Sequence, residues 1–72
     1  MIEVNINELG ERIKELRLER GLSQKELADK IGVATNTISQ YESGKSKTSI
    51  TVLANLAIAL DTTTDFLLGL ET

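Results

Sequence analysis

The chain has 72 residues, of which 40% are hydrophobic and 26% are charged, and this is the composition of one small globular domain. It contains no Cys and no His, so disulfides, thiol nucleophiles, Cys/His zinc sites and imidazole catalysis are excluded. No apolar run approaches the roughly 20 residues of a membrane span, and no stretch resembles a signal peptide. We therefore expect a cytoplasmic protein without cofactor or metal, and not an enzyme, a secreted mini-protein or a membrane protein.

The net charge of −3 is unevenly distributed along the sequence. All eight basic residues lie between positions 12 and 47, where they outnumber five acidic residues, whereas the rest of the chain has six acidic residues and no basic one. Such asymmetry is typical of a basic face on an acidic body, although a solvated helical surface is an equally good interpretation.

Residues 1–7 are predicted to form an N-terminal arm ahead of a domain that spans residues 8–70. In the arm, Ile2, Val4 and Ile6 alternate with polar residues, which is the period of a strand rather than of a helix. Two interpretations stay open, namely a loosely packed arm and a strand that pairs with a partner chain.

The domain itself shows helical periodicity interrupted by turn residues. The first predicted helix runs from residue 6 or 8 to residue 20, with Asn5 as a candidate N-cap. The second opens at a capping box formed by Ser23 and Glu26 and ends at Gly32. Four glycines each follow a predicted helix, at the position where a left-handed residue ends it: Gly21, Gly32, Gly44 and Gly69.

Three shorter helices are predicted in the second half of the chain. They span residues 35–43, residues 50–60 after a Ser49 cap, and residues 64–68 after a cap at Thr62 or Thr63. The inward-facing residues of the first four helices repeat at helical spacing: Leu9, Ile13, Leu16, Leu27, Ile31, Ile38, Tyr41, Ile50, Leu53, Leu56, Ala57 and Leu60.

The second and third helices, joined by a three-residue turn, have the spacing of a helix-turn-helix motif. With Ile38 facing inward, Asn36 and Gln40 lie on the opposite side of the third helix, flanked by Thr37 and Ser39. This outer face is neutral and forms hydrogen bonds, and amide side chains of this kind recognise adenine in the major groove. The pattern favours a DNA-reading face over a polar surface helix without a partner.

A structural ion pair is also predicted. Glu42 lies toward the inner side of the third helix, and Arg17 borders the apolar stripe of the first. Because neither charge tolerates burial alone, we expect the two to pair and to hold the third helix against the first.

Five runs of sequence, at residues 13–17, 21–28, 31–33, 38–45 and 56–60, carry a family resemblance. The chain resembles the Cro/lambda-repressor family of helix-turn-helix proteins, also called XRE-like, over about residues 9–68. The resemblance implies an all-α fold, a compact five-helix bundle whose second and third helices form the helix-turn-helix. It also implies a bacterial or phage transcriptional regulator that binds double-stranded operator DNA.

The resemblance further implies roles for individual residues. Base-reading roles fall on one face of the third helix, at Thr35, Asn36 and Gln40. Contacts to DNA phosphates fall on the start of the second helix and on the loop after the third: Gln24, Ser43, Lys45 and Lys47. From their flanking places on the helical wheel, we add Ser39 to the base readers and Thr37 to the phosphate contacts. The sequence departs from the family pattern at Ala34, Thr48 and Asp61, where the family often has Ser or Thr, Pro and Gly. The third helix therefore lacks its usual cap unless Thr35 substitutes for it.

Because one recognition helix reads only a few base pairs, we expect a homodimer and an approximately palindromic operator. The predicted interface involves the fifth helix and its surroundings: Ile58, Thr64, Phe66, Leu67 and Leu70. Ile58 could alternatively pack beneath the fifth helix of its own chain.

The leading hypothesis is a sequence-specific repressor. The alternatives are the antitoxin of a toxin–antitoxin pair, using residues 1–7 to bind the toxin, and a protein-interaction module without DNA binding. A small complete regulator and the DNA-binding part of a longer one both fit.

Overall fold

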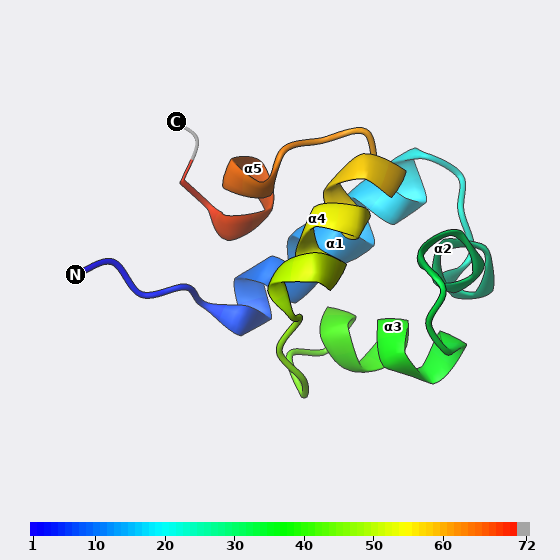
Figure 1. The fold of residues 1–72 in the computed structure, drawn as a ribbon, viewed down its shortest axis with the longest axis horizontal. Helices are drawn as coiled ribbons and strands as arrows, with labels where there is room; N and C mark the ends of the chain where they lie inside the picture. The colour runs from blue at the N-terminus through cyan, green and yellow to red at the C-terminus, as the bar shows by residue number, and fades with distance from the viewer. Residues whose placement is uncertain (71–72) are drawn as a thin grey trace.

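The computed structural model describes residues 1–70, and within that range it contains five α-helices and no strand. In chain order the helices are α1 (Ile6–Glu19), α2 (Gln24–Ile31), α3 (Thr35–Glu42), α4 (Ile50–Ala59) and α5 (Thr64–Leu68), as Figure 1 shows. The predicted all-α, five-helix fold is confirmed. α1 begins at Ile6, which is the earlier of the two starts predicted for the first helix.

Side chains satisfy the free N–H groups at four of the five helix starts. Asn5, Ser23, Ser49 and Thr63 each accept a hydrogen bond from a main-chain N–H of the first turn. The start of α3 is different, because Ala34 provides no such bond, as expected from the sequence. The first turn of α3 therefore has main-chain N–H groups that no cap satisfies.

The turn between α4 and α5 requires a left-handed residue. Asp61 adopts a φ of 53° there, and it is the one residue other than glycine with positive φ among residues 1–70. Arg20 supports this turn, since its Nε donates to the Leu60 carbonyl at 3.0 Å and its NH2 to the Asp61 carbonyl at 3.3 Å. The end of α1 is thereby fixed to the end of α4.

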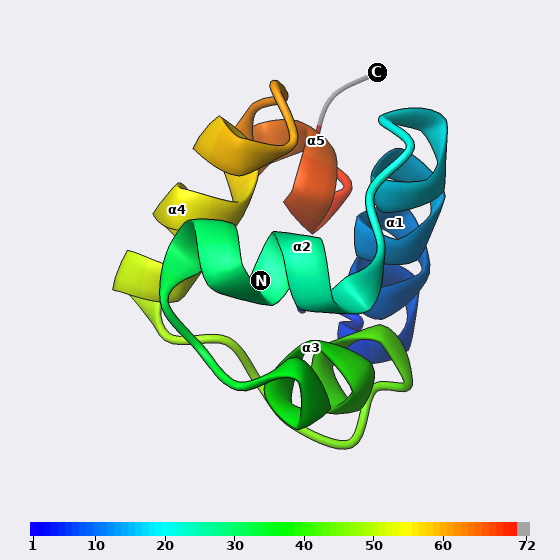
Figure 2. The ribbon, with the colours of Figure 1, turned by 90° about the vertical axis from the view of Figure 1, so that its right-hand side faces the viewer.

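All five helices contribute to the core: α1 packs against α3 and α5, α2 packs against α3 and α4, and α4 also packs against α5. Figure 2 shows α2 crossing between α1 and α4, with α3 beneath it. Most predicted core residues are confirmed, and the buried apolar set is Leu9, Ile13, Leu16, Leu27, Ala28, Ile38, Tyr41, Leu56, Ala57, Leu60 and Leu67. One assignment is wrong, because Ile50 is 88% exposed. It is the first residue of α4, where the helix has not yet reached the core.

A close contact between main chains fixes α3 against α1. At Gly10, a Cβ would overlap the carbonyl oxygen of Tyr41 and would lie 2.6 Å from that of Glu42. Only glycine allows α1 to approach the end of α3 this closely. The position of α3 is therefore set by contact with the backbone of α1 as well as by side-chain packing.

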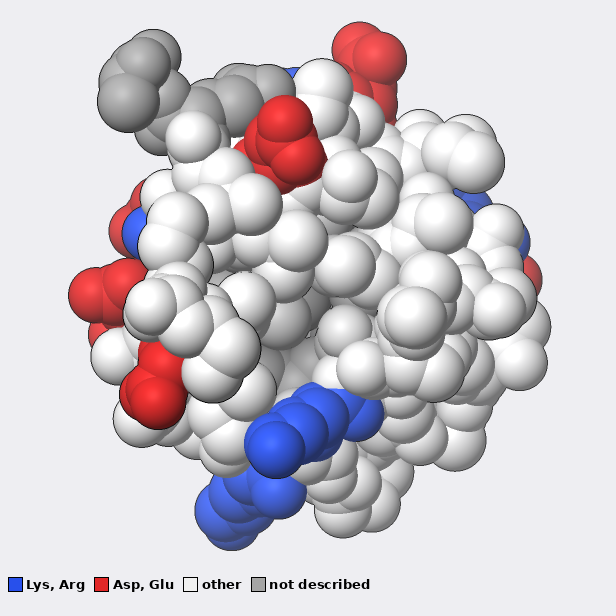
Figure 3. All heavy atoms as spheres, turned by 60° about the vertical axis from the view of Figure 1, so that its left-hand side comes forward, with Lys and Arg blue, Asp and Glu red and all other residues white. Residues whose placement is uncertain are grey.

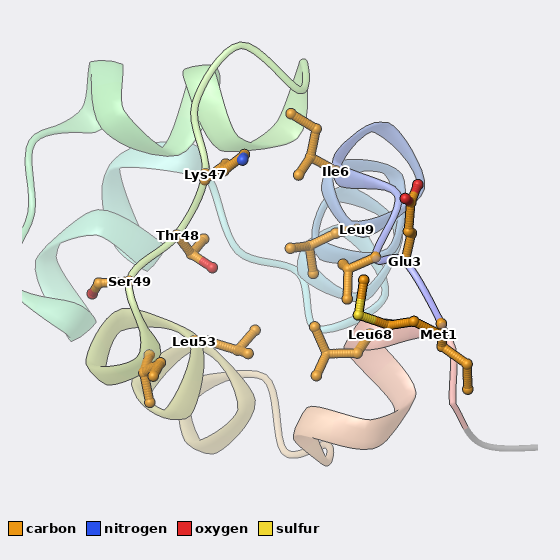
Figure 4. A pocket seen from close by; sticks show the side chains of 12 residues that line it. Met1, Glu3, Ile6, Leu9, Lys47, Thr48, Ser49, Leu53 and Leu68 are labelled. Carbon is orange, nitrogen blue, oxygen red and sulfur yellow. The ribbon is translucent and has the colours of Figure 1, made fainter.

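A hollow of about 530 Å³ lies between the N-terminal arm, the start of α4 and the end of α5. Figure 3 shows this face, on which uncharged side chains dominate and basic side chains gather at one edge. Apolar side chains of the arm, α1, α4 and α5 provide most of the lining, and Lys47 points from the α3–α4 loop toward Ile6 (Figure 4). Among residues 1–70, no helix combines the length and apolar character that a membrane crossing requires.

Candidate nucleic-acid interface

The helix-turn-helix is formed by α2 and α3, and α3 lies at the bottom of the bundle in both Figure 1 and Figure 2. Its inner side packs against α1 and α2, where Ile38 is wholly buried and Tyr41 is 9% exposed. No other helix among residues 1–70 covers its lower side in either view. The surface of α3 that faces away from Ile38 is therefore open to a partner.

The outer surface of α3 has the polarity that the helical wheel predicts. Thr35 and Asn36 are exposed, whereas Thr37, Ser39 and Gln40 are half-buried. All five side chains are neutral hydrogen-bonding groups, and the one charged residue of α3, Glu42, is buried on the opposite side. The structure thus gathers the predicted base-reading side chains on one open surface without competing charges.

The predicted ion pair of Arg17 with Glu42 is confirmed as a buried, two-armed interaction. Nε of Arg17 donates to Oε2 of Glu42 at 2.7 Å, and NH2 donates to Oε1 at 3.2 Å. The remaining arm, NH1, donates to the carbonyl of Leu22 at 2.9 Å, just before α2. The two side chains are 9% and 4% exposed. This network connects α1, α3 and the entry to α2, and so it fixes the geometry of the helix-turn-helix.

Gln24 takes part in the same network, which the sequence did not predict. Its Nε2 donates to Oε1 of Glu42 at 3.1 Å, so the side-chain amide is directed toward the α2–α3 contact. Gln24 is the first residue of α2, and main-chain N–H groups at a helix start attract phosphate. The phosphate contact of Gln24 remains a prediction. Because its side chain bonds Glu42, we expect the main-chain N–H of Gln24 to make this contact.

A capping box fixes the first turn of α2, the first helix of the helix-turn-helix. Ser23 accepts from the Glu26 N–H at 3.0 Å, and Glu26 accepts from the Ser23 N–H at 2.9 Å. The main-chain hydrogen bond, followed by the hydroxyl of Ser23, lowers the pKa of the Glu26 carboxyl. The carboxylate is therefore the form that the folded chain favours.

The loop after α3 presents the predicted phosphate contacts. Ser43, Lys45 and Lys47 are all exposed, and within residues 1–70 neither lysine lies in an ion pair. Lys25, in contrast, bonds Asp29 at 2.8 Å, and this hydrogen bond raises the pKa of Lys25. The two loop lysines, which follow α3 in the chain, thus have no acidic partner among the described residues.

The predicted dimer interface is only partly accessible. Ile58 is 78% exposed and Phe66 and Leu70 are 39% and 45% exposed, while Thr64 is half-buried. Ile58 therefore does not pack beneath α5 of its own chain. Leu67 is wholly buried in the core of the chain, so its assignment to the interface is wrong. On a five-residue helix, the side chain that fixes α5 to the bundle cannot also meet a partner.

Comparison with known proteins identifies the family to which this chain belongs. The sequence profile described as helix-turn-helix matches residues 13–67, which is most of the chain. The chain belongs to the XRE-like helix-turn-helix family. Its members are DNA-binding transcriptional regulators and not enzymes.

Individual relatives agree with this assignment. The chain is 44% identical over 61 residues to the HTH-type transcriptional regulator AnsR of Bacillus subtilis, covering 85% of this chain and 53% of AnsR. It is 39% identical over 59 residues to the SPbeta prophage-derived regulator YonR of the same organism, covering 82% of this chain and 55% of YonR. The chain thus spans about half the length of these relatives.

A solved structure with the same fold contains DNA. The P22 c2 repressor protein in complex with a synthetic operator superposes with a TM-score of 0.83 and 32% identity. The match covers 88% of this chain and 96% of that one. The predicted lambda-repressor-like architecture is confirmed.

Proposed function

We propose that this chain is a cytoplasmic, sequence-specific DNA-binding regulator, a repressor that inserts α3 into the major groove of double-stranded operator DNA. The observation that carries the proposal is the division of α3 into a buried inner side and an open, neutral outer side. Thr35, Asn36, Ser39 and Gln40 are the base readers. Asn and Gln each combine a donor with an acceptor, which matches N6 and N7 of adenine.

Phosphate contacts position α3 on the duplex. Lys45 and Lys47 follow α3 directly and have no acidic partner among the described residues. Ser43 and Thr37 provide hydroxyls at the edge of the same surface, and the start of α2 provides main-chain N–H groups. The overall charge of −3 does not oppose binding, because DNA responds to the local field of this surface.

The proposal includes a homodimer on an approximately palindromic operator. Ile58, Phe66 and Leu70 are exposed apolar side chains on or beside α4 and α5, two helices that pack together. In Figures 1 and 2, α5 and α3 lie on different sides of the bundle, so a partner at α5 leaves the outer side of α3 open. Two copies joined in this way place their α3 helices in successive major grooves, about 34 Å apart.

The decisive experiment selects the preferred duplex from random-sequence DNA and then compares variants on it. We expect Gln40→Ala to weaken binding to the selected duplex by about 1–3 kcal/mol and binding to random DNA much less. Its melting temperature should change little, because Gln40 lies outside the buried core and its side chain forms one hydrogen bond among residues 1–70, with Ser46. The control, Ile38→Ala, should lose about 2–5 kcal/mol of folding stability and lose DNA binding only as a consequence.

An unchanged ratio of selected to random binding in Gln40→Ala would instead support the protein-interaction module.

Assembly is tested separately by sedimentation equilibrium and by footprinting of the selected duplex. We expect weak dimers that Ile58→Ser weakens further, and two protected half-sites. Tight protection of a single half-site by one chain would contradict the dimer.

A further inference from the structure

The turn that follows α3 is built around Gln40. The carbonyl oxygen of Gln40 accepts from the N–H of Lys45 at 2.9 Å and of Ser46 at 3.4 Å, and from the hydroxyl of Ser43 at 3.2 Å. The hydroxyl of Ser46 then donates to the side-chain Oε1 of Gln40 at 3.2 Å. Ser46 is thus bonded to Gln40 at both the main chain and the side chain.

This second bond distinguishes Gln40 from the other amide on the outer side of α3. Asn36 is exposed, and among residues 1–70 no side chain of another residue bonds its carboxamide, whereas Gln40 is half-buried and held by a hydroxyl. A free glutamine has three rotatable side-chain bonds, and binding in one orientation costs conformational entropy. A hydroxyl that holds the carboxamide before DNA arrives removes part of that cost.

We propose that Ser46 is a positioning residue that sets the orientation in which Gln40 presents its carboxamide to a base. The inference rests on the proposed function and adds a residue that determines specificity without reading a base. When the Ser46 hydroxyl donates to Oε1, the two Nε2 hydrogens and the second lone pair of Oε1 stay available. A donor and an acceptor then face the groove together, which is the pair that adenine requires.

The test measures discrimination between two duplexes. The first is the selected duplex, and the second differs from it at the base pair whose preference Gln40→Ala abolishes. Discrimination is the Kd for the second duplex divided by the Kd for the selected one. We expect Ser46→Ala to lower this ratio by about 2- to 12-fold, which is the range expected for immobilising one flexible side chain. Ser46→Thr keeps the hydroxyl and should restore the ratio.

Ser43→Ala is the matched control, because it removes a hydroxyl that bonds the main-chain carbonyl of Gln40 and not its side chain. Because Ser43 is also a proposed phosphate contact, Ser43→Ala should weaken binding to both duplexes alike and leave discrimination unchanged. A readout without DNA is also available, since the side-chain amide resonances of Gln40 in the free protein should shift in Ser46→Ala and not in Ser43→Ala. In the background of Gln40→Ala, adding Ser46→Ala should have no further effect on discrimination.

The outcomes separate this inference from the proposed function. If Gln40→Ala lowers discrimination but Ser46→Ala leaves it intact, the positioning role is refuted and base reading by Gln40 stands. If Ser46→Ala weakens binding to both duplexes equally, the hydroxyl contacts the DNA backbone and the positioning role is again refuted. If Gln40→Ala abolishes the preference at no base pair of the selected duplex, both proposals fail.

Discussion

Removal of the Glu42 carboxylate is the most severe change that the structure predicts for a single polar side chain. In Glu42→Ala, Arg17 keeps its bond to the Leu22 carbonyl but loses both carboxylate bonds in a site where its side chain is 9% exposed. Breaking a buried pair by removing one partner costs about 3–5 kcal/mol. A chain of this length has a total stability of about 4–11 kcal/mol, so much of it is lost.

The assay is urea denaturation followed by circular dichroism, with the double variant Arg17→Met/Glu42→Leu as the control. The double variant removes both charges and fills the site with apolar side chains, so we expect it to recover most of the lost stability. A loss below about 0.5 kcal/mol in Glu42→Ala would refute the reasoning, because that is the effect of an ordinary surface substitution. Equal losses in the single and double variants would show that shape, and not charge, is what the site requires.

Three further predictions follow from contacts described above. Gly10→Ala should cost about 3 kcal/mol in urea denaturation and weaken DNA binding, since the main chain of α3 must move; an unchanged midpoint would contradict the close approach. Lys45→Ala and Lys47→Ala should each weaken binding to all duplexes alike and lower the slope of log K against log salt by about 1; altered base preference with an unchanged slope would make them base readers. Because the pKa of Glu26 is lowered from its ordinary value of 4.5, its carboxylate stabilises the fold above that pH and ceases to do so as the pH falls through the lowered value. The stability gap between the wild type and Glu26→Gln should therefore close in acid, and a gap that persists there would contradict the assignment.

Periodicity and capping residues were sufficient to predict the five helices, because each signal is local. The same local signals misplaced Ile50, which has the right spacing for the core stripe but lies at the exposed first position of α4. Leu67 was misplaced in the opposite direction, since a five-residue helix gives too little sequence to establish which side is buried. In both cases the deciding information is the tertiary position of the helix.

The candidate site shows the same division between local and tertiary information. The outer side of α3 and the pair of Arg17 with Glu42 followed from the helical wheel, because burial of one side determines what the other presents. The bonds of Gln24 to Glu42 and of Ser46 to Gln40 could not be predicted in this way. They depend on the path of a turn and on the relative position of two helices.

The two sides of α3 also differ in how freely they can change over evolutionary time. Substitutions at Ile38 or Glu42 are opposed by selection for folding, whereas those at Asn36, an exposed side chain, leave the bundle unaffected. Mutations can therefore accumulate on the outer side while the bundle stays folded, and under the proposed function each one changes the DNA sequence that α3 reads. A duplicated copy of such a gene could acquire a new target within a few substitutions, without first gaining stability to offset them.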